Sequence, residues 1–365
     1  MRKFLKFILL LISFLLAVAL AGVYGLSFLE PERIGILAFT WFAFPYLWIV
    51  CGVVFVYALF RRNLISVIVL ALSLFLTWHG MASIVNFGTT PESYGNQQIK
   101  IMSFNVRFFN GSQNKPSSID PNTILHFIDS VSPDVICLQE VAYNNTLKDK
   151  GFASIEDFFK DYKYVVRSTH QGDAHSARNE QVIVSRFPLT VAMEDSISDE
   201  LHSLLLVADA MVGDRKVRIF NAHLASIKLS AAQISAVGKA RKGDLDDGTK
   251  QNLRETRDKM WSAFVERAVQ VRKLRQLIDC EDVPAIVCGD FNDTPISYTY
   301  QTVSPGLGDA FMEASGGFSN TYNGKLPPLR IDYILYSDAM YAVDYQEYKV
   351  DLSDHFPISA VIEFR

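Results

Sequence analysis

Two short motifs near the end of the chain carry side chains that could do chemistry. Gly-Asp-Phe-Asn-Asp at 289–293 follows an apolar, strand-like run, and Ser-Asp-His-Phe-Pro at 353–357 precedes the last such run. Asp290 and Asn292 lie two residues apart, so in extended backbone both face the same side. Carboxylate, amide and imidazole groups held at strand ends can bind a hard cation and transfer protons. The two motifs therefore predict a site for metal-assisted or acid–base chemistry.

Further polar side chains end other strand-like runs in this part of the chain. They are Asn105, Glu140, Asn221, His223, Asp332, Asp354 and His355. Singly, most have a structural explanation: a glutamate at a strand end is commonly solvated, asparagine favours turns, and His223 fits a hydrogen-bonded core position equally well. Asp332 is harder to explain, because a carboxylate within an apolar strand needs a partner. As a set, these oxygen ligands suit Mg²⁺ or Mn²⁺, and the sequence has no Cys/His cluster at zinc spacing.

The elements that must position these groups are mostly strands. Apolar or alternating runs predict strands at 99–106, 134–138, 164–167, 181–185, 204–211, 216–223, 283–288, 330–336 and 358–364. Helices are predicted at 122–130 and 252–279, whereas 230–249 predicts a loop or a weak helix. This order predicts an α+β fold in which two packed sheets are flanked by helices.

Six segments resemble, in order, the motifs of the endonuclease/exonuclease/phosphatase superfamily, which includes deoxyribonuclease-I-like proteins. They are Ser-Phe-Asn-Val-Arg (103–107), Leu-Gln-Glu-Val (138–141), Asn-Ala-His-Leu (221–224), Gly-Asp-Phe-Asn-Asp (289–293), Arg-Ile-Asp-Tyr-Ile (330–334) and Ser-Asp-His-Phe-Pro (353–357). The resemblance covers residues 98–365. It implies a four-layered α/β/β/α sandwich with two packed mixed β-sheets, and divalent-metal-dependent hydrolysis of a phosphoester, foremost a phosphodiester. At 180–185 the chain lacks a glycine that the superfamily often has, which bears on the substrate loop and not on the metal site.

The resemblance implies a metal site with Mg²⁺ or Mn²⁺ as cofactor. Carried over to this chain, Glu140 would be the principal metal ligand, supported by Asn105. Asp354 would be a second ligand. An acidic site that holds a cation is expected to be metal-dependent and active near neutral pH, since clustered carboxylates raise one another's pKa and a bound cation lowers it.

The resemblance also implies catalytic roles for five residues. Asp290 would position or deprotonate the attacking water, and Asn292 would hold the phosphoryl oxygens. His355 would contact the scissile phosphate, with Asp332 hydrogen-bonded to its other ring nitrogen, an arrangement that fixes the tautomer. His223 would protonate the leaving oxygen. The alternative is a catalytically silent binding protein that retains the fold, although none of the named polar positions is replaced in this chain.

The first quarter of the chain has a different composition. Apolar runs at about 4–26, 35–60 and 64–85 each approach the twenty or so residues that cross a bilayer, so residues 1–87 are predicted to form an anchor of three transmembrane helices. Residues 88–98, which contain glycine and proline, predict a flexible linker, and residues 99–365 the catalytic domain. An integral membrane protein is expected.

Basic residues near the apolar runs predict how the anchor is oriented. Arg2 and Lys3 precede the first run, and Arg61 and Arg62 separate the second from the third. The positive-inside rule therefore places the N-terminus in the cytoplasm and the catalytic domain on the periplasmic or other extracytoplasmic side. A cleaved signal peptide is the alternative for the first run, because Ala19-Leu20-Ala21 fits the cleavage pattern. Cleavage would leave two crossings and the same external domain.

The net charge bears on the class of substrate, and the cysteine positions bear on the core. The formal net charge of −4 does not favour an extended nucleic-acid platform, and the substrate is expected to be a phosphoester in a nucleic acid or a phospholipid headgroup. No obligate protein partner is evident. A basic segment after His223 fits either phosphate contacts or a solvated helix face, since acidic residues are mixed with Arg241, Lys242, Lys250, Arg254, Arg257 and Lys259. Cys137 and Cys288 fit small buried apolar residues, with a disulfide left open.

Overall fold

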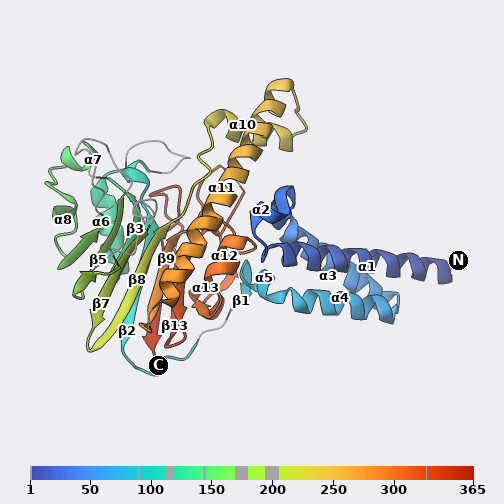
Figure 1. Cartoon of the computed structure of the whole chain (residues 1–365), viewed down its shortest axis with the longest axis horizontal. Coiled ribbons are helices and arrows are strands. Elements are labelled where there is room, and N and C mark those ends of the chain that lie inside the picture. The colour runs from blue at the N-terminus through green and yellow to red at the C-terminus, as the bar shows by residue number, and fades with distance from the viewer. Residues whose placement is uncertain are drawn as a thin grey trace.

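The computed structural model shows a two-sheet sandwich from which a bundle of apolar helices projects (Figure 1). It describes residues 2–88, 91–111, 119–142, 145–168, 180–193, 205–280, 282–325 and 327–365.

The sandwich consists of two six-stranded mixed sheets. One has the strand order β13-β14-β2-β3-β5-β4 and the other the order β10-β12-β9-β8-β7-β6. The bounds in the first sheet are β2 (Gln98–Asn105), β3 (Val135–Val141), β4 (Tyr164–Arg167), β5 (Glu180–Ser185), β13 (Met340–Glu347) and β14 (Ile358–Phe364). Those in the second are β6 (Leu189–Val191), β7 (Leu205–Val212), β8 (Arg215–His223), β9 (Ala285–Asp290), β10 (Leu307–Asp309) and β12 (Asp332–Ser337). Each sheet contains one parallel pair, β2–β3 or β8–β9, and its other neighbours are antiparallel.

Helices cover the outer face of each sheet. The helices of the domain are α6 (Pro121–Val131), α7 (Asn145–Lys148), α8 (Ile155–Phe158), α10 (Ala231–Arg241), α11 (Asp247–Asp279), α12 (Tyr298–Val303) and α13 (Ala310–Ala314), with a short 3₁₀ turn at Arg107–Phe109. One apolar core lies between the sheets, a second under α6 and α8, and a third under α11. The predicted α+β fold with two packed mixed sheets is confirmed, and the three cores separate four layers.

Two features of the domain differ from the expectation. The segment predicted as a loop or weak helix contains α10, because Ser230 and Gln233 form a reciprocal capping box at its start. Strand β13 was not predicted, since its sequence mixes apolar and charged residues. It is an edge strand that pairs only with β14. All four cysteines are free thiols, and Cys137 and Cys288 are buried as expected.

The N-terminal bundle offers two candidate membrane spans where three were predicted. The segments Lys3–Leu26 and Pro31–Phe60 are long and apolar enough to cross a membrane, by length and composition. The third run forms a shorter helix, Leu64–Leu76, because the backbone leaves the helical conformation at Thr77, with φ −102° and ψ 7°, before a separate short helix begins at Trp78. The bundle is built from α1 (Arg2–Leu26), α2 (Pro31–Ile34), a 3₁₀ segment (Gly35–Ala43), α3 (Phe44–Phe60), α4 (Leu64–Leu76) and α5 (Trp78–Ala82).

The bundle packs directly against α11 of the domain. The ring of Phe264 on α11 lies 5.2 Å from that of Phe39 and 5.5 Å from that of Trp41, measured between centroids. Farther along α11, Arg272 forms ion pairs of 3.8 and 3.3 Å with Glu30 and Glu32. Residues of the bundle and of the domain thus share one apolar core, and the orientation of the sandwich relative to the apolar helices is fixed.

The described residues of the predicted flexible linker are also held in place. Strand β1 (Val85–Phe87) pairs with β11 (Gly316–Phe318). Farther on, the carboxylate of Glu363 in β14 accepts hydrogen bonds from the Ser93 hydroxyl, the Tyr94 and Asn96 amides and the Gln98 side chain. These contacts hold the described residues of the segment against the surface of the domain, so the segment is not a free linker there.

Candidate active site

The two parallel strand pairs bring four of the predicted site residues to one edge of the sandwich. Strand β2 ends at Asn105, β8 at His223 and β9 at Asp290, while Glu140 lies one residue before the end of β3. The carboxyl ends of parallel strands meet at the same edge of a sheet, and here the two sheets pack with these edges together. Side chains far apart in sequence therefore converge.

Backbone irregularities direct these side chains into the site. Glu140 adopts a positive φ of 53°, and the register of β3 with β5 shifts between Leu138 and Val141. Such a bulge re-aims the side chain it contains. At Gly289, φ is 139°, and a Cβ there would lie 1.8 Å from the carbonyl oxygen of Ala222. Only glycine allows β8 and β9 to approach this closely just before Asp290.

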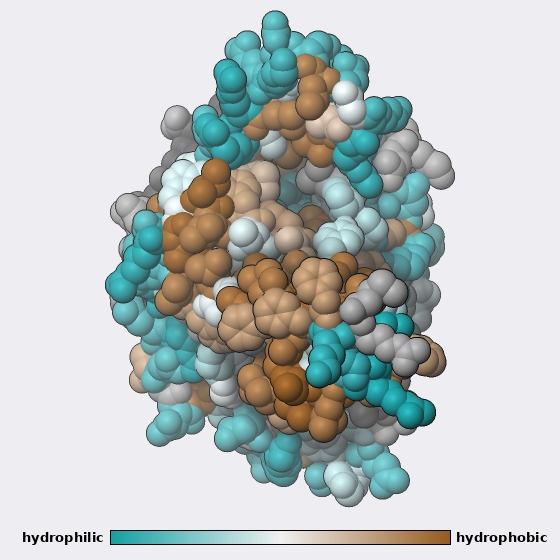
Figure 2. Space-filling model, turned by 90° about the vertical axis from the view of Figure 1, so that its right-hand side faces the viewer, coloured by the Kyte–Doolittle hydropathy of each residue, from teal (hydrophilic) through white to brown (hydrophobic). Residues whose placement is uncertain are grey.

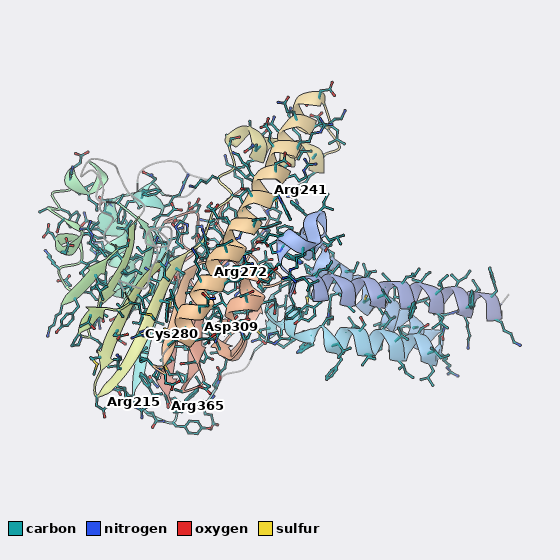
Figure 3. The ribbon with its side chains drawn as sticks, viewed as in Figure 1. Arg215, Arg241, Arg272, Cys280, Asp309 and Arg365 are labelled. Carbon is teal, nitrogen blue, oxygen red and sulfur yellow. The ribbon has the colours of Figure 1, made fainter. Side chains whose placement is uncertain are left out.

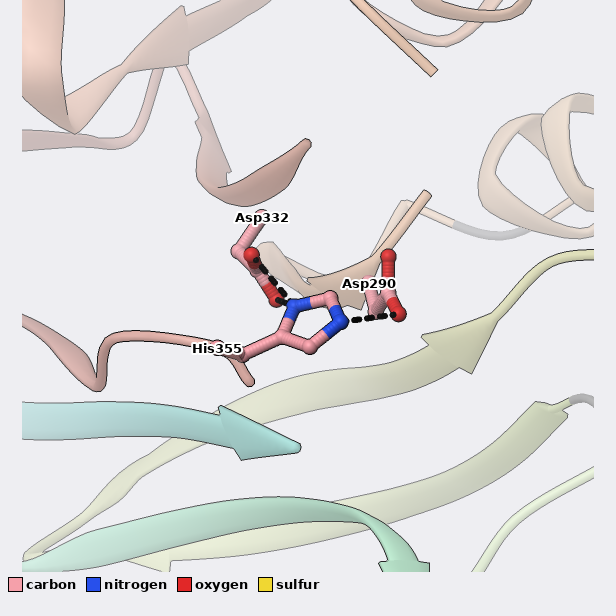
Figure 4. A group of neighbouring side chains, drawn as sticks. All are labelled: Asp290, Asp332 and His355. Atoms are coloured by element: carbon pink, nitrogen blue, oxygen red, sulfur yellow. Dashed lines mark hydrogen bonds and ion pairs between the residues drawn. The ribbon is translucent and has the colours of Figure 1, made fainter. Parts of the chain in front are cut away.

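Asp290, Asp332 and His355 form the centre of the site (Figure 4). Asp332 lies opposite Asp290 in the β12–β9 register. The Nδ1 atom of His355 is 3.0 and 3.2 Å from the two carboxylate oxygens of Asp332, and its Nε2 atom is 3.5 Å from an oxygen of Asp290. Although burial opposes protonation, the charges of Asp332 and Asp290 raise the pKa of His355 well above its usual range. The two carboxylates therefore favour the protonated form of His355.

Asn105 connects this centre to Glu140. Its amide nitrogen donates to Asp290 at 3.1 Å and to Glu140 at 3.3 Å, while its amide oxygen accepts from the backbone N–H of Arg107 at 3.0 Å. Since a backbone N–H can only donate, this contact fixes which way the amide points. In this arrangement the amide nitrogen of Asn105 orients the two carboxylates, and its amide oxygen faces the backbone of Arg107.

Asn292 holds the loop that follows β9. Its backbone N–H donates to one oxygen of Asp290 at 2.8 Å, and its side-chain amide donates to the other at 3.2 Å and to the Leu224 carbonyl at 3.0 Å. The residue adopts φ of 53°, a left-handed conformation that asparagine tolerates well. The Gly-Asp-Phe-Asn motif is thus a tight turn that points both polar groups toward the site.

The second histidine has the opposite protonation tendency. The Nε2 atom of His223 lies 3.6 Å from an oxygen of Glu140 and 3.6 Å from an oxygen of Asp290. Burial lowers the pKa of His223. The carboxylate of Asp290 raises this pKa, and the positive charges of His355 and Lys228 lower it further. His223 is neutral near pH 7, so a general-acid role requires it to gain a proton when substrate binds.

Carboxylates outnumber cations in the site. Burial raises the pKa of Glu140, and burial together with the nearby charge of Asp332 raises the pKa of Asp290 to about 6. Asp354 pairs with Arg107, whose Nε atom is 3.3 Å away. Among the described residues, the four carboxylates of Glu140, Asp290, Asp332 and Asp354 thus lie near His355 and Arg107.

This donor set fits a hard divalent cation. Asp290, Asp332 and His355 place ligand atoms within 4.8 Å of one another, and both ring nitrogens of His355 already face carboxylates. Glu140 and Asp354 are more accessible, with side-chain exposures of 21% and 12%. Oxygen ligands with excess negative charge match the preference of Mg²⁺ and Mn²⁺.

One predicted strand-end residue has a structural role. Asn221 is fully buried between the sheets, where it accepts from the Gln139 amide at 2.7 Å and donates to the carbonyls of Leu138 and Val182. The amide pair Gln139–Asn221 joins the two sheets behind the site. The place of Gln139 in an apolar strand, where a polar side chain needs a partner, was the available signal.

Other supporting residues were not identified from the sequence. The Thr321 hydroxyl accepts from the backbone N–H groups of Ile331 and Asp332 and so fixes the start of β12. The ring of Tyr322 packs edge-on against His355 with centroids 5.9 Å apart. Thr321 and Tyr322 lie in an irregular segment whose sequence carries no strand or helix period, so only the three-dimensional fold places them here.

Comparisons with known proteins assign a family to the domain. The model of the family described as the Endonuclease/Exonuclease/phosphatase family matches residues 102–355. This stretch contains all eight predicted site residues. Residues 5–83 match a second family, described as a domain of unknown function. No curated protein matches the chain.

Several solved structures are similar to the domain at low identity. A family protein from Bacteroides thetaiotaomicron is 16% identical, with a TM-score of 0.48, over 74% of this chain and 100% of that one. The corresponding protein from Bacteroides vulgatus is 16% identical, with a TM-score of 0.48, over 73% and 99%. Truncated TDP2 from Caenorhabditis elegans is 18% identical, with a TM-score of 0.45, over 73% and 98%.

Proposed function

Because this chain belongs to the endonuclease/exonuclease/phosphatase family, whose members hydrolyse phosphoesters with a divalent metal, we propose that it cleaves a phosphodiester at a membrane surface. One observation carries the proposal: a continuous set of contacts joins Asp332, His355, Asp290, Asn105 and Glu140, with carboxylates in excess. A structural cluster would be expected to balance its charges, since a buried unpaired charge is costly. The excess suits a site that receives a cation and a phosphoester.

Asp290 is the proposed general base. The attacking water gives a proton to the Asp290 carboxylate as its oxygen bonds to phosphorus. A pKa raised to about 6 suits this step, because a base works best when its pKa lies near the operating pH. Asn292, hydrogen-bonded to Asp290, would exchange its side-chain hydrogen bond to the Leu224 carbonyl for one to a phosphoryl oxygen as the charge on that oxygen grows.

His355 would stabilise the charge that develops on the phosphoryl group. Its Nε2–H faces the site, while Asp332 holds Nδ1 and keeps the ring protonated and oriented. His223, at the end of β8, is placed to deliver a proton to the leaving oxygen as the phosphorus–oxygen bond breaks. Glu140 and Asp354, with Asn105 orienting Glu140, would hold Mg²⁺ or Mn²⁺, which supplies a Lewis acid for the phosphoryl oxygen when bound.

The location is part of the proposal. The segments Lys3–Leu26 and Pro31–Phe60 would anchor the chain as an integral membrane protein. Arg61 and Arg62 follow the second segment and mark its cytoplasmic end under the positive-inside rule. After Arg62, the shorter helix Leu64–Leu76 would have to carry the chain back across the membrane. The domain, packed at the opposite end of the bundle (Figure 1), would then face the periplasmic or extracellular side.

The test uses the full chain purified in a mild detergent. Hydrolysis of bis(4-nitrophenyl) phosphate is expected with Mg²⁺ or Mn²⁺, to stop with a chelator, and to be lost in His355→Ala. A panel of plasmid DNA, RNA, sphingomyelin, phosphatidylinositol phosphates and 4-nitrophenyl phosphate then separates nuclease, lipid phosphodiesterase and phosphatase. A folded protein that turns over no member of the panel with either metal contradicts the proposal and favours a silent binding protein.

A further inference from the structure

A helical arm follows directly from the active-site strand β8. We define the arm as residues 230–260, which contain α10 and the first part of α11. At its base, Lys259 donates to the Lys228 carbonyl and to the Gln233 side chain, and so links α11 to the segment that leaves the site. Figure 1 shows the arm projecting beyond the sheets at the top of the view, above α2 and on the side that carries the bundle.

The position of the arm relative to the apolar helices is fixed by α11 itself. The same helix that forms the arm contacts the bundle through Phe264 and, two turns later, through Arg272. Figure 3 shows Arg241 on the arm and Arg272 beside the bundle, whereas Arg215 and Arg365 lie at the opposite end of the sheets. If the bundle crosses a bilayer, the arm is held against the surface of that bilayer.

The charges of the arm are positive on balance. It contains seven Lys and Arg and five Asp and Glu residues, a net charge of +2 in a chain whose total is −4. Three cations are matched within the arm, by the pairs Lys239–Asp246, Lys250–Asp247 and Arg257–Asp258. Glu255 accepts from glutamine side chains. In the described structure, the exposed Arg241, Lys242 and Arg254 have no acidic partner, and Asp244 is the opposing exposed acid.

An apolar side chain sits at the turn between the two helices of the arm. Leu245 is 50% exposed and follows Arg241 and Lys242 by a few residues. Figure 2, which views the molecule from the bundle side, shows apolar surface on the arm bordered by hydrophilic groups. Basic side chains around an exposed apolar one are the pattern of a segment that rests in the headgroup region.

We propose that the arm binds the surface of an anionic phospholipid bilayer, with Arg241, Lys242 and Arg254 on the headgroups and Leu245 at the acyl boundary. This inference rests on the membrane anchoring proposed above, and it adds a second contact between the chain and the lipid surface. Each basic residue near such a surface contributes roughly fivefold to binding. The unmatched cations of the arm together would hold it there for most of the time.

The experiment reconstitutes the full chain in lipid nanodiscs. An environment-sensitive fluorophore is attached at Leu245→Cys in a Cys280→Ser background, because Cys280 is exposed whereas Cys51, Cys137 and Cys288 are buried. Discs contain phosphatidylcholine alone or in equal parts with phosphatidylglycerol. We expect a blue shift of the emission in the anionic discs and little or none in the zwitterionic ones. A label at Lys160→Cys, beyond α8 on the far side of the sheets (Figure 1), should not respond to lipid.

Two matched charge reversals test the chemistry. Arg241→Glu with Lys242→Glu should abolish the shift at Leu245→Cys, and Arg254→Glu alone should weaken it. Lys160→Glu with Lys163→Glu changes the net charge equally on exposed residues far from the arm and should leave the shift intact. All these positions are exposed, so folding should be retained, which circular dichroism checks.

Each result bears on a single claim. A chain that does not enter nanodiscs overturns the anchoring and this inference with it. A chain that enters them but shows no lipid-dependent shift, or a shift on added DNA in place of lipid, overturns the role of the arm alone. Hydrolysis of bis(4-nitrophenyl) phosphate in the same samples reports separately on the proposed activity.

Discussion

Two kinds of buried charge occur within this domain, and they are built differently. At the active site, Asp290 and Asp332 surround the single cation His355 at distances of 3.0–3.5 Å. Next to it, Arg267 on α11 is fully buried and meets one carboxylate, Asp293, at 3.0 Å. The first group has surplus negative charge, and the second is balanced.

The Arg267–Asp293 pair holds the backbone segments next to the candidate active site. Besides Asp293, Arg267 donates to the Ala225 carbonyl at 2.8 Å, so one guanidinium joins the loops that follow β8 and β9. A similar pair, Arg330 with Asp309, has Arg330 donating to the Ser83 carbonyl at the bundle. Buried pairs with balanced charge thus hold the backbone, whereas the group with excess negative charge is the one proposed to bind a cation and a substrate.

The largest effect is expected from removing the surplus charge at the site. Asp290→Asn should lower hydrolysis of bis(4-nitrophenyl) phosphate by about a thousandfold, since it removes the base and a preorganised electrostatic group. The free energy of unfolding, measured by urea titration in detergent near pH 7, should not fall and should rise, because the amide keeps the shape and removes a buried like charge. Asp149→Asn, at an exposed acid, is the control, and turnover close to wild type in Asp290→Asn contradicts the assignment.

The balanced pair should respond in the opposite way. Arg267→Met leaves Asp293 buried without its cation and should reduce the free energy of unfolding by about 3–5 kcal/mol. Arg257→Met breaks an exposed ion pair on the same helix and should cost less than about 1 kcal/mol. Adding Asp293→Asn to Arg267→Met should recover part of the loss. Equal destabilisation by Arg267→Met and Arg257→Met would show that the buried pair does not stabilise the fold more than the exposed one.

A divalent cation should stabilise only the unbalanced group. At a hundredfold excess over its dissociation constant, Mg²⁺ would add about 2.7 kcal/mol to the free energy of unfolding. Thermal unfolding with and without a chelator measures this gain. Glu140→Gln removes a proposed ligand and should lose most of the gain, whereas Arg257→Met should keep all of it. An unchanged gain in Glu140→Gln would place the cation elsewhere.

The last prediction concerns how the free energy of unfolding depends on pH in the absence of metal. It distinguishes Asp290 from Glu363. The folded pKa of Asp290 is raised from 3.8 to about 6, so the unfolded chain ionises first and stability falls as pH rises between these values. The folded pKa of Glu363 is lowered from 4.5 to about 2, so its contribution is present above pH 4.5 and is lost as pH falls toward 2. Asp290→Asn should remove the first slope and Glu363→Gln the second in unfolding titrations with a chelator. Unchanged slopes in both variants would refute these assignments.

The sequence predicts the site better than the surroundings that hold it. Strand-end residues such as Asp290 and His355 are recognisable because polar groups at the ends of apolar runs are few and recur in ordered motifs. Asn221 looked equivalent to them, yet it bonds Gln139 between the sheets, because strand-end position alone does not say which face a side chain occupies. Arg267 lies in the predicted helix at 252–279 among many other charged residues, and only the packing of α11 shows that it is buried.

The predictions for the first hundred residues were less accurate for a related reason. Hydropathy counts apolar residues and does not locate the break at Thr77, where the backbone leaves the helical conformation. Glycine and proline between 88 and 98 predicted flexibility, but the contacts that bind this segment come from Glu363, about 270 residues later. Long-range partners of this kind leave no periodic pattern in the sequence.

The position of β14 has a consequence for synthesis of the protein. This last strand lies inside its sheet, between β13 and β2, and pairs with β2 from Ile358 to Glu363. While the chain emerges from the ribosome, one edge of β2 therefore stays open until the residues of β14 have been made. Until β14 is in place, the nascent domain exposes an unpaired strand edge that could associate with another chain.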